Sequence, residues 1–320
     1  NTIYTLNYFS NFMKIHKGFD SFPKLSKAVV TTGTFDGVHL GHKKILNELI
    51  NIGVRNNTET VLVTFSPHPR IVLFPDSELK LINTVDENIE LLKKFNIDHL
   101  IIQQFDRQFS RITSLDYVRD ILLKKIGLKD LVIGFNHHFG RNREGSLENL
   151  EEYADLYDFS IHQVGAHNIK EQSVSSTKIR NALHDGDIQL ANHYLGYNFK
   201  IFGKIIKGQG IGKNLGFPTA NVSLGNSNKL TPKKGVYAVN MHWQNHKLQG
   251  MLNIGVNPTI HNNKSTSIEV NIFDFHKDIY GETLHIEFVQ RIRSEKKFPT
   301  IDALKHQLNI DRIAALNILN

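Results

Sequence analysis

The hydrophobic pattern of this chain changes in kind near residue 185, and this change limits the folds that are possible. Before it, short runs rich in Val, Ile and Leu alternate with helix-length segments in which apolar residues recur every three or four positions. From Phe199 onward the apolar runs follow one another with no helices between them. Strands separated by helices predict a parallel sheet, whereas consecutive strands predict an antiparallel sheet or barrel. The sequence therefore predicts two domains of different class.

The first half is expected to form a parallel, Rossmann-like α/β sheet with helices on both faces. Its expected strands are Ala28–Thr32, Val61–Phe65, Leu100–Gln104, Leu131–Phe135 and Ser160–Val164. Its expected helices are Lys43–Ile52, Asp86–Phe95, Leu115–Ile126 and Leu147–Tyr157. Ligands bind such sheets beyond the carboxyl ends of the strands, so we expect the site in the segments that follow the strands.

The second half is expected to form a small antiparallel β-barrel closed by a terminal helix. A short helical segment, Ile188–Leu195, precedes it. The expected strands are Ile201–Ile206, Val236–Trp243, Leu248–Ile254, Ile268–Phe275 and Leu284–Gln290, and the terminal helix runs from Thr300 to Leu308 or beyond. We place the domain boundary so that residues 1–185 form the first domain and residues 186–320 the second.

Charge and composition exclude several classes of protein. The net charge of +7 and the pI near 9.3 would suit a nucleic-acid partner, but the basic residues are scattered and the densest groups are pairs such as Lys233-Lys234. This scatter fits a protein that binds polyphosphates, so we expect no nucleic-acid partner. No window approaches about 18 consecutive apolar residues, so we expect no membrane-spanning helix and no membrane partner.

The absence of cysteine excludes disulfides, thiolate metal sites and a cysteine nucleophile. The N-terminal segment also lacks the apolar core of a signal peptide. A cytoplasmic location is therefore the default expectation. The sequence does not determine the oligomeric state.

The segment Gly33-Thr-Phe-Asp-Gly-Val-His-Leu-Gly-His42 lies between the first expected strand and a helical pattern. The start of a helix offers unpaired N–H groups and about half a positive charge, which together bind phosphates. Two histidines on a turn can be ordinary surface residues, but the glycines and the aspartate around them favour a nucleoside triphosphate site. The candidate residues of this site are Gly33, Phe35, Asp36, His39, Gly41 and His42.

Three further segments of the first half are candidates of lower specificity. Ser176, Thr177 and Arg180 begin a helix and suit a triphosphate, although Ser176 can be a simple N-cap. The segment Gly134–Gly145 carries glycines, arginines and adjacent histidines, but it has no recognisable metal-ligand spacing. His68 either closes a turn or lines the site, and the spacing does not decide which.

The segment from Gly208 to Asn221 is the richest loop of the second half. It is not a Walker A loop, because Asn214 stands where Ser or Thr is required, and it lacks the spacing of a dinucleotide fingerprint. Its glycines, including Gly208 and Gly210, can still cradle phosphates beside Lys213. Thr219 and Asn221 offer oxygen ligands of the kind that Mg²⁺ accepts.

Glu269 alternates with apolar neighbours in an expected strand, so its side chain lies on the sheet face opposite to theirs. A carboxylate in such a position is usually just solvated. If it lies at the open side of the barrel, it can accept the proton of a hydroxyl group.

Together these residues carry a family resemblance. The chain closely resembles the bacterial bifunctional riboflavin kinases/FMN adenylyltransferases, also called FAD synthetases, from about Ala28 to Ala315. The motifs of the resemblance are Gly33–His42, Phe65-Ser-Pro-His-Pro69, Gly134–Gly145, Ser175–Arg180 and Gly216-Phe-Pro-Thr-Ala-Asn221, with support from Gly235-Val-Tyr237, Asn253-Ile-Gly255, Glu269 and Arg293-Ser-Glu295-Lys-Lys-Phe298. It departs from the family at Asn136-His137, often Asp-Phe, and at Lys213, often arginine.

For the barrel half, the resemblance implies phosphorylation of the ribityl 5′-hydroxyl of riboflavin by ATP, giving FMN. Thr219 and Asn221 would hold Mg²⁺ and the ATP phosphates, together with Gly208, Gly210, Lys213 and Pro218. Glu269 would be the base, and Arg293 and Glu295 would lie on the flavin side.

For the α/β half, an adenylyltransferase of nucleotidyltransferase fold, the resemblance implies that the FMN phosphate attacks the α-phosphate of a second ATP. FAD and pyrophosphate are the products. His39 and His42 would neutralise the phosphate charge, Ser176, Thr177 and Arg180 would close on the phosphates, and Asn136 would contact the flavin. Two alternatives remain open: a class I tRNA-synthetase-like fragment, which should end in a helical domain, and a non-catalytic flavin carrier.

Overall fold

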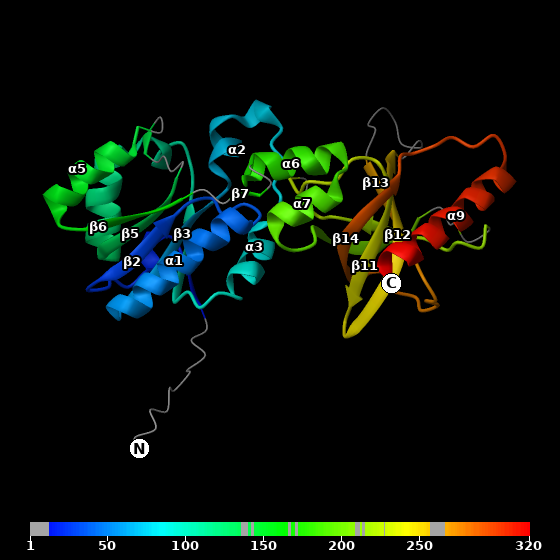
Figure 1. Ribbon diagram of the computed structural model, residues 1–320, viewed down its shortest axis with the longest axis horizontal. Helices are drawn as coiled ribbons and strands as arrows, with labels where there is room; N and C mark the ends of the chain where they lie inside the picture. Colours follow the sequence, from blue (N-terminus) through cyan, green and yellow to red (C-terminus); the bar gives the residue numbers. More distant parts are fainter. Residues whose placement is uncertain are drawn as a thin grey trace, which may run out of the picture. The chain divides into compact units, whose positions relative to one another are not determined.

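The computed structural model describes residues 13–135, 140–141, 144–165, 168–169, 172–208, 212, 215–226, 228–256 and 266–320. The chain divides into two compact units, Asn1–Val174 and Ser175–Asn320 (Figure 1). Three predicted site residues, Asn136, Gly210 and Lys213, lie outside the described residues.

The first unit contains a parallel sheet of six strands, which confirms the predicted fold class. The strands, in chain order, are β1 (Lys14–Lys17), β2 (Ala28–Thr32), β3 (Glu59–Ser66), β4 (His99–Gln104), β5 (Leu128–Gly134) and β6 (Ser160–Val164). Their order across the sheet is β1-β4-β3-β2-β5-β6, and every neighbouring pair is parallel. The chain winds from β2 in one direction and returns to the other side of β2 at β5. The switch point between β2 and β5 is where sheets of this kind bind ligands.

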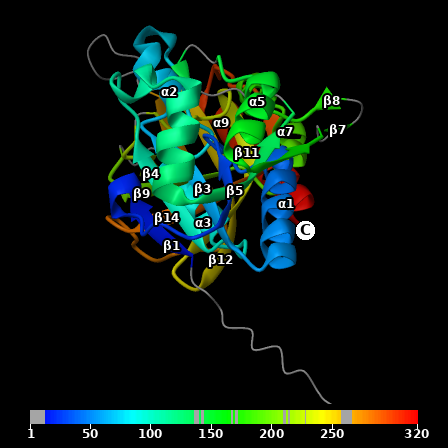
Figure 2. The same ribbon diagram turned by 90° about the vertical axis from the view of Figure 1, so that its left-hand side faces the viewer.

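Helices cover both faces of this sheet. On one face Val30, Val63 and Leu131 pack against the π-helical segment η4 (Tyr117–Ile126) and against α5 (Leu147–Tyr157). The other face contacts α1 (Leu40–Asn56), which runs along the strands in Figure 2. The remaining helices are α2 (Pro69–Leu73), α3 (Val85–Leu92), α4 (Ser114–Asp116) and three 3-10 turns, η1 (Phe19–Ser21), η2 (Pro75–Ser77) and η3 (Phe109–Arg111). A short hairpin, β7 (Asn168–Ile169) and β8 (Gln172–Ser173), ends the unit.

Strand β1 was not predicted. Its four residues, Lys-Ile-His-Lys, are mostly exposed and show no apolar run. It forms because its backbone pairs with the edge of β4, which hydrophobic periodicity does not reveal. The segment Leu115–Ile126 was predicted as an ordinary helix, and most of it has π-helical hydrogen bonding, which is rare.

The second unit begins with two helices, α6 (Ser176–Asp185) and α7 (Ile188–Leu195). Gly186 ends α6 in a left-handed conformation (φ 83°). The Asn192 side chain accepts a hydrogen bond from the Phe199 N–H (2.7 Å) and donates one to the Phe288 carbonyl (2.9 Å). Ile188, Ala191, Tyr194 and Leu195 are all buried. These helices are therefore an integral part of the barrel unit.

The rest of this unit is a closed barrel with the strand order β10-β13-β12-β11-β14-β9. Its strands are β9 (Lys200–Ile206), β10 (Ala220–Ser223), β11 (Gly235–Trp243), β12 (His246–Val256), β13 (Thr266–Ile272) and β14 (Thr283–Arg293). All the pairings are antiparallel, as predicted. Strand β10 was not predicted, because its first two residues, Ala220 and Asn221, end the segment that we interpreted as a phosphate loop.

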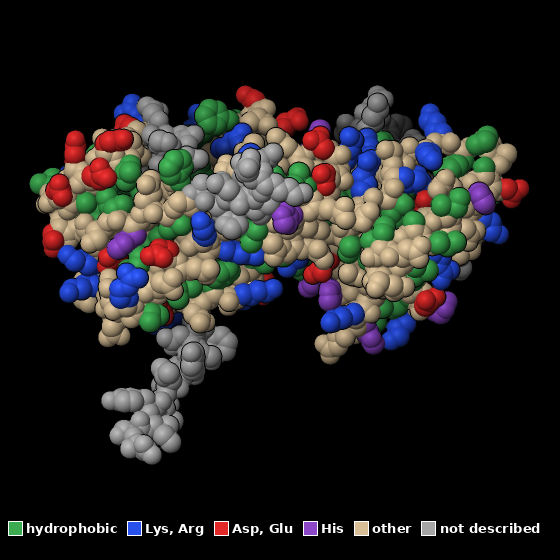
Figure 3. All heavy atoms as spheres, viewed as in Figure 1, with side chains coloured by type: hydrophobic (Ala, Val, Ile, Leu, Met, Phe, Trp, Pro, Cys, Tyr) green, Lys and Arg blue, Asp and Glu red, His purple; other side chains and the backbone are tan. Residues whose placement is uncertain are grey.

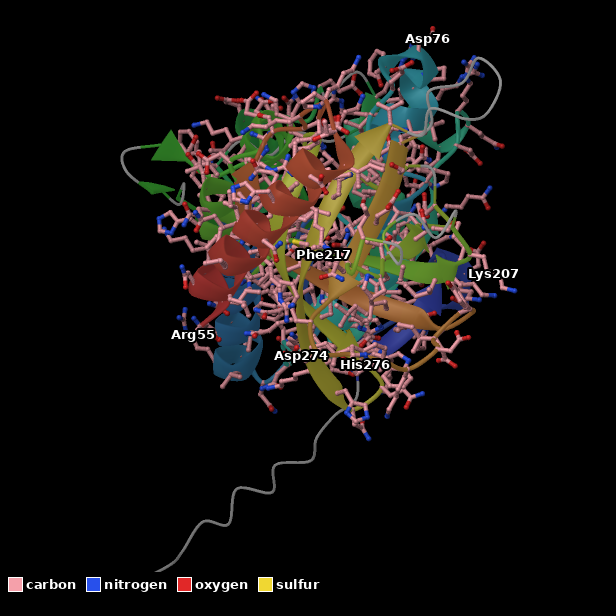
Figure 4. The ribbon with its side chains drawn as sticks, turned by 90° about the vertical axis from the view of Figure 1, so that its right-hand side faces the viewer. Arg55, Asp76, Lys207, Phe217, Asp274 and His276 are labelled. Atoms are coloured by element: carbon pink, nitrogen blue, oxygen red, sulfur yellow. The ribbon has the colours of Figure 1, made fainter. Side chains whose placement is uncertain are left out.

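The barrel has two faces that matter for the site. Apolar side chains such as Tyr237, Leu252 and Phe288 are completely buried and fill the interior. On the outer face, Val236, Ala238 and Met251 pack against α9 (Ile301–Leu319). Phe217 belongs to the same cluster and lies between α9 and the barrel strands in Figure 4. Among the described helices, none combines the length and hydrophobicity that crossing a bilayer requires.

Candidate active sites

The histidine motif lies where the sheet topology places a ligand site. It follows β2, the central strand, and contains the first turn of α1. His39 is the N-cap of α1, and its Nδ1 accepts a hydrogen bond from the His42 N–H (3.3 Å). Because Nδ1 is an acceptor, the neutral His39 ring carries its proton on Nε2. Gly41, also in this turn, lies against the His39 ring.

The two imidazole rings form one stacked unit. Their centroids are 3.6 Å apart and their planes differ by 16°. The Phe35 ring also contacts His42, with a centroid distance of 5.0 Å. The Nδ1 atom of His42 is buried and has no hydrogen-bond partner among the described residues. A buried polar atom without a partner is unusual and is consistent with a partner supplied by a ligand.

Burial lowers the pKa of His42 well below its ordinary value of 6.5, and the neighbouring His39 lowers it further. His42 is therefore neutral at pH 7 when no ligand is bound. An anionic phosphate beside the ring would favour the charged form and raise this pKa. The His42 ring can thus take up a proton when a phosphate binds beside it.

This shift predicts that stability depends on pH. Below pH 6.5 the unfolded chain protonates His42 while the folded chain does not, so the unfolded state binds more protons. The free energy of unfolding should therefore fall as the pH is lowered from about 7 to 5. Thermal unfolding of the wild type and of His42→Gln across this range measures the effect, and the variant should show the weaker pH dependence. Equal slopes for the two proteins would contradict the shift.

The turn between β2 and α1 has a strained backbone. Phe35 (φ 45°), Gly37 (φ 88°) and Val38 (φ 35°) all have positive φ, which is rare for a β-branched residue such as Val38. Asp36 is 3 % exposed, and its carboxylate accepts hydrogen bonds from the backbone N–H groups of Ile82 (3.2 Å) and Asn83 (3.1 Å). Strain of this kind persists only where surrounding contacts hold it. The geometry favours a positioning role for Asp36, and its contact with a nucleotide stays a prediction.

Residues at the ends of the neighbouring strands β3 and β5 lie near this turn or follow those strands. The Gly33 N–H donates to the Val63 carbonyl (3.0 Å), which ties the turn to β3. Strand β5 ends at Gly134, which lies beside Ile45 of α1. His68 follows β3 and N-caps α2, since its Nδ1 accepts from the Arg70 N–H (3.1 Å). The capping of a turn is thus one role of His68 that the structure shows.

Ser176, Thr177 and Arg180 lie in the first turns of α6, which opens the second unit. The capping explanation for Ser176 is wrong, because Ser175 is the N-cap and accepts from the Lys178 N–H (3.4 Å). Ser176 is instead the first residue of the helix, the end that favours negative charge.

In the barrel, strand register brings the predicted kinase residues together. Asn221 of β10 lies directly opposite Glu269 of β13, and Glu269 lies opposite Asn253 of β12. The same row continues to Val236 of β11 and Arg293 of β14. Directly paired residues of an antiparallel sheet share one face, so these side chains belong to a single surface.

This surface is the outer face of the barrel, since Val236 packs against α9 and Arg293 is bonded to it. Glu269 therefore lies on the outer face of the barrel, and its position at the open side stays a prediction. Alternation had shown that Glu269 and its apolar neighbours lie on opposite faces, but only the closed topology shows which face is outside.

The glycine loop folds onto the same surface. A Cβ atom on Gly208 would collide with the Asn221 amide, and one on Gly212 would lie 3.1 Å from Thr219 Oγ1. Thr219 Oγ1 in turn donates to Glu269 Oε2 (3.4 Å). The Pro218 carbonyl accepts from Asn271 Nδ2 (2.7 Å), which fixes the loop to β13. A hydroxyl, an amide and a carboxylate thus converge at one place, beside Gly208 and Gly212.

Arg293 and Glu295 have different environments. The Arg293 guanidinium forms a bidentate ion pair with Asp311 of α9 (2.6–3.0 Å), so its donors are already engaged. Glu295 Oε1 lies 2.6 Å from the position that a Cβ atom would have on Gly255. The geometry favours Glu295 over Arg293 as the group available to a flavin.

Sequence reasoning missed two functional candidates. Asn253 was quoted only as part of a motif, although register places it opposite Glu269. Asp311 was not singled out at all, because a lone aspartate within an amphipathic helix resembles a solvated residue. Its apolar neighbours do not mark a buried face either, since Ile310 and Ile313 are both exposed in the structure.

Comparison with known proteins identifies the family. The family model described as FAD synthetase matches residues 21–178, and the one described as Riboflavin kinase matches residues 195–319. Curated proteins named bifunctional riboflavin kinase/FMN adenylyltransferase match almost the whole chain. The protein of Buchnera aphidicola subsp. Schizaphis graminum is 35% identical over 93% of this chain and 96% of its own length. The chain belongs to this family.

Two further relatives agree. The protein of the same name from Listeria monocytogenes is 36% identical over 88% of this chain and 90% of its own, and that of Escherichia coli K12 is 32% identical over 95% and 97%. A solved structure described as a macrolide-efflux protein from Streptococcus pneumoniae has a TM-score of 0.87 and 31% identity, covering 96% of this chain and 99% of that one. That description names a transport role, whereas both family models and the curated relatives above name flavin enzymes.

The predicted class of enzyme is thereby confirmed: the chain is a transferase with riboflavin kinase and FMN adenylyltransferase activities. The tRNA-synthetase alternative required a helical C-terminal domain, and this part of the chain is a closed barrel. The carrier alternative is set aside because each half matches the model of an enzyme family.

Proposed function

We propose that the barrel unit phosphorylates riboflavin to FMN and that the α/β unit adenylylates FMN to FAD, each at the surface described above. ATP is the phosphate donor in the first reaction and the adenylyl donor in the second, which releases pyrophosphate. The observation that carries the proposal is the row Asn221–Glu269–Asn253, with Thr219 bonded to Glu269, because it assembles the groups of a phosphoryl-transfer site on one face.

In the kinase reaction, Glu269 accepts the proton of the riboflavin 5′-hydroxyl as the γ-phosphoryl group is transferred. Gly208 and its neighbours bind the ATP phosphates through backbone N–H groups, and Glu295 contacts the flavin. Phosphoryl transfer depends mainly on positioning and charge stabilisation, which suits a loop folded tightly onto rigid strands. The close packing of Gly208 against Asn221 supports this assignment, since a larger residue would displace the loop.

The donor set also suits Mg²⁺. Mg²⁺ prefers oxygen ligands and keeps several waters, so it commonly takes only one or two groups from the protein together with substrate phosphates. Thr219 and Asn221 offer a hydroxyl and an amide oxygen beside the Glu269 carboxylate, and they would hold the ion there. When bound, Mg²⁺ supplies charge neutralisation for the transferring phosphoryl group.

In the adenylyltransferase reaction, the FMN phosphate is already an anion and attacks the ATP α-phosphate without a general base. His39 donates from Nε2, and His42 becomes charged beside the phosphates because their negative charge raises its pKa. We propose Ser176, Thr177 and Arg180 as further phosphate-binding residues, because they lie in the first turns of α6.

The proposed partners are therefore riboflavin, FMN and ATP, with no nucleic acid and no membrane, and we propose a cytoplasmic location. On the face shown in Figure 3, Lys and Arg side chains lie among Asp, Glu and uncharged ones and form no continuous stripe.

The direct test is incubation of the protein with riboflavin, ATP and Mg²⁺, followed by chromatographic separation of the flavins. FMN should appear first and FAD should follow. Supplying FMN in place of riboflavin should give FAD even when the kinase site is disabled. Formation of neither product from fully folded protein would refute the proposal.

The two activities should also be separable, and the division into compact units supports a choice of fragment. The functional boundary at 185/186 stays a prediction, but the compact units divide between Val174 and Ser175, so α6 packs with the barrel. A fragment of residues 175–320 is expected to convert riboflavin to FMN and to make no FAD.

A fragment that begins at Phe199 should be markedly less stable, because it loses Asn192 and the buried face of α7. Thermal unfolding of the two fragments, with chromatography of their flavin products, measures both effects. A folded fragment of residues 175–320 that leaves riboflavin unchanged would contradict the assignment of kinase chemistry to the barrel.

A further inference from the structure

Asp311 is a completely buried carboxylate in the middle of α9 (0 % exposed). It accepts hydrogen bonds from Arg293 Nε (2.8 and 3.0 Å), from Arg293 Nη2 (2.6 Å) and from Gln307 Nε2 (2.9 Å). A bidentate pair of this kind fixes the guanidinium in orientation as well as in position. The pair joins the end of β14 to the helix that covers the barrel.

The pair is poorly explained by stability alone. Removing two charges from water costs several kcal/mol per ion, and apolar side chains of similar volume are often equally or more stabilising. The neighbouring contacts of α9 are apolar, among them Ala315 against Val236 and Ala238. An apolar pair would therefore suit this interface. The use of a charged pair is better explained by the residues that the Arg293 guanidinium orients.

The Arg293 side chain organises the segment 294–300, which we call the β14–α9 loop. Its Nη1 donates to the Ser294 carbonyl (2.9 Å), and its guanidinium lies over the Phe298 ring, 5.8 Å from the centroid. Two residues of this loop, Ser294 and Phe298, thus contact the same guanidinium group, which is itself held by Asp311.

This loop carries Glu295 to the kinase surface. Glu295 Oε1 and Asn253 Nδ2 lie 2.6 and 3.2 Å from the same point, the position of a Cβ atom on Gly255. Gly255 must lack a side chain for Glu295 to reach this place. Asn253 in turn lies opposite Glu269, so the loop conformation determines what faces the proposed base.

We propose that Asp311 and Arg293 are positioning residues of the kinase reaction, which hold the β14–α9 loop so that Glu295 faces Asn253 and Glu269. Arg293 acts through the loop and makes no contact with the flavin. This inference rests on the proposed kinase site in the barrel.

The test uses the full-length protein with Asp311→Asn, Arg293→Gln and the double variant, in which a neutral Gln–Asn pair leaves no buried charge unpaired. Each of the three should raise the KM for riboflavin by about 10- to 100-fold, the cost of misplacing a substrate-contacting group by ~1 Å. The changes should not add, because both residues act through one pair. The matched control is Arg312→Gln, which removes an exposed ion pair with Asp274 (3.1 Å) from the same helix and should leave the KM unchanged.

The outcomes separate the possible roles. A large effect of Arg293→Gln with a near-normal KM for Asp311→Asn would show that Arg293 contacts the flavin, and would overturn the proposal. A lower unfolding temperature with an unchanged KM in the double variant would show a purely structural pair. Glu269→Gln, measured in parallel, tests the kinase site itself: normal activity there refutes the proposed function, whereas its loss together with a normal KM for Asp311→Asn refutes only the positioning role.

Discussion

Replacing His42 with alanine is expected to reduce FAD formation from FMN and ATP by about 10²-fold or more, the usual cost of losing one preorganised donor. The ring is held in place by stacking on His39 (3.6 Å) and by contact with Phe35 (5.0 Å), so no reorganisation is needed when the phosphates arrive. Steady-state rates of FAD formation with saturating FMN measure the effect.

The internal control for this variant is the kinase reaction of the same protein, which should be nearly unchanged. A matched histidine control is His184→Ala, whose side chain is 89% exposed and pairs only loosely with Asp185 (3.9 Å). Equal loss of both activities in His42→Ala would indicate a folding defect or a shared site, and the role of His42 would then be wrong.

Replacing Glu269 with glutamine is expected to reduce FMN formation by roughly 10²–10⁴-fold, the contribution of a general base. Glutamine keeps the size of the side chain and can still accept the hydrogen bond from Thr219, so the loop should stay in place. Flavin binding should therefore be largely retained, and fluorescence titration with riboflavin measures it separately from turnover.

FAD synthesis from supplied FMN should survive in this variant, because its proposed site lies in the other unit. Glu282→Gln is the matched control, since Glu282 is an exposed carboxylate of the same barrel unit and should have no effect. Near-normal phosphorylation of riboflavin by Glu269→Gln would make this glutamate an ordinary strand residue.

Most of the secondary structure was predictable because it follows from local periodicity and from turn residues. Strands Ala28–Thr32 and Ser160–Val164 and helices Leu147–Tyr157 and Ile188–Leu195 have the predicted bounds. Among the strands that were missed are β1 and β10, which have four residues each and form through pairing with neighbours that are distant in sequence. Pairing of this kind leaves little trace in composition.

The candidate sites also combine features that are local in the sequence with features that are not. The motifs and their order along the chain carried the family resemblance, and that resemblance implied two reactions on two folds. Phosphate-binding turns were visible because they have local signatures. Burial is not a local property. The burial of Asp311 and the engagement of Arg293 depend on α9 crossing the outer face of the barrel, and no spacing in the sequence encodes that contact.

The sequence by itself thus determined the class of each half, the family and the groups that can do the chemistry. Only the tertiary structure decided which of those groups are free to act. Barrel closure places Glu269 on the outer face with Asn221 and Asn253, and the strained turn after β2 stacks His39 on His42. The physical reason is that hydrogen-bond partners and desolvation, which control orientation and protonation, are supplied by segments far apart in the chain.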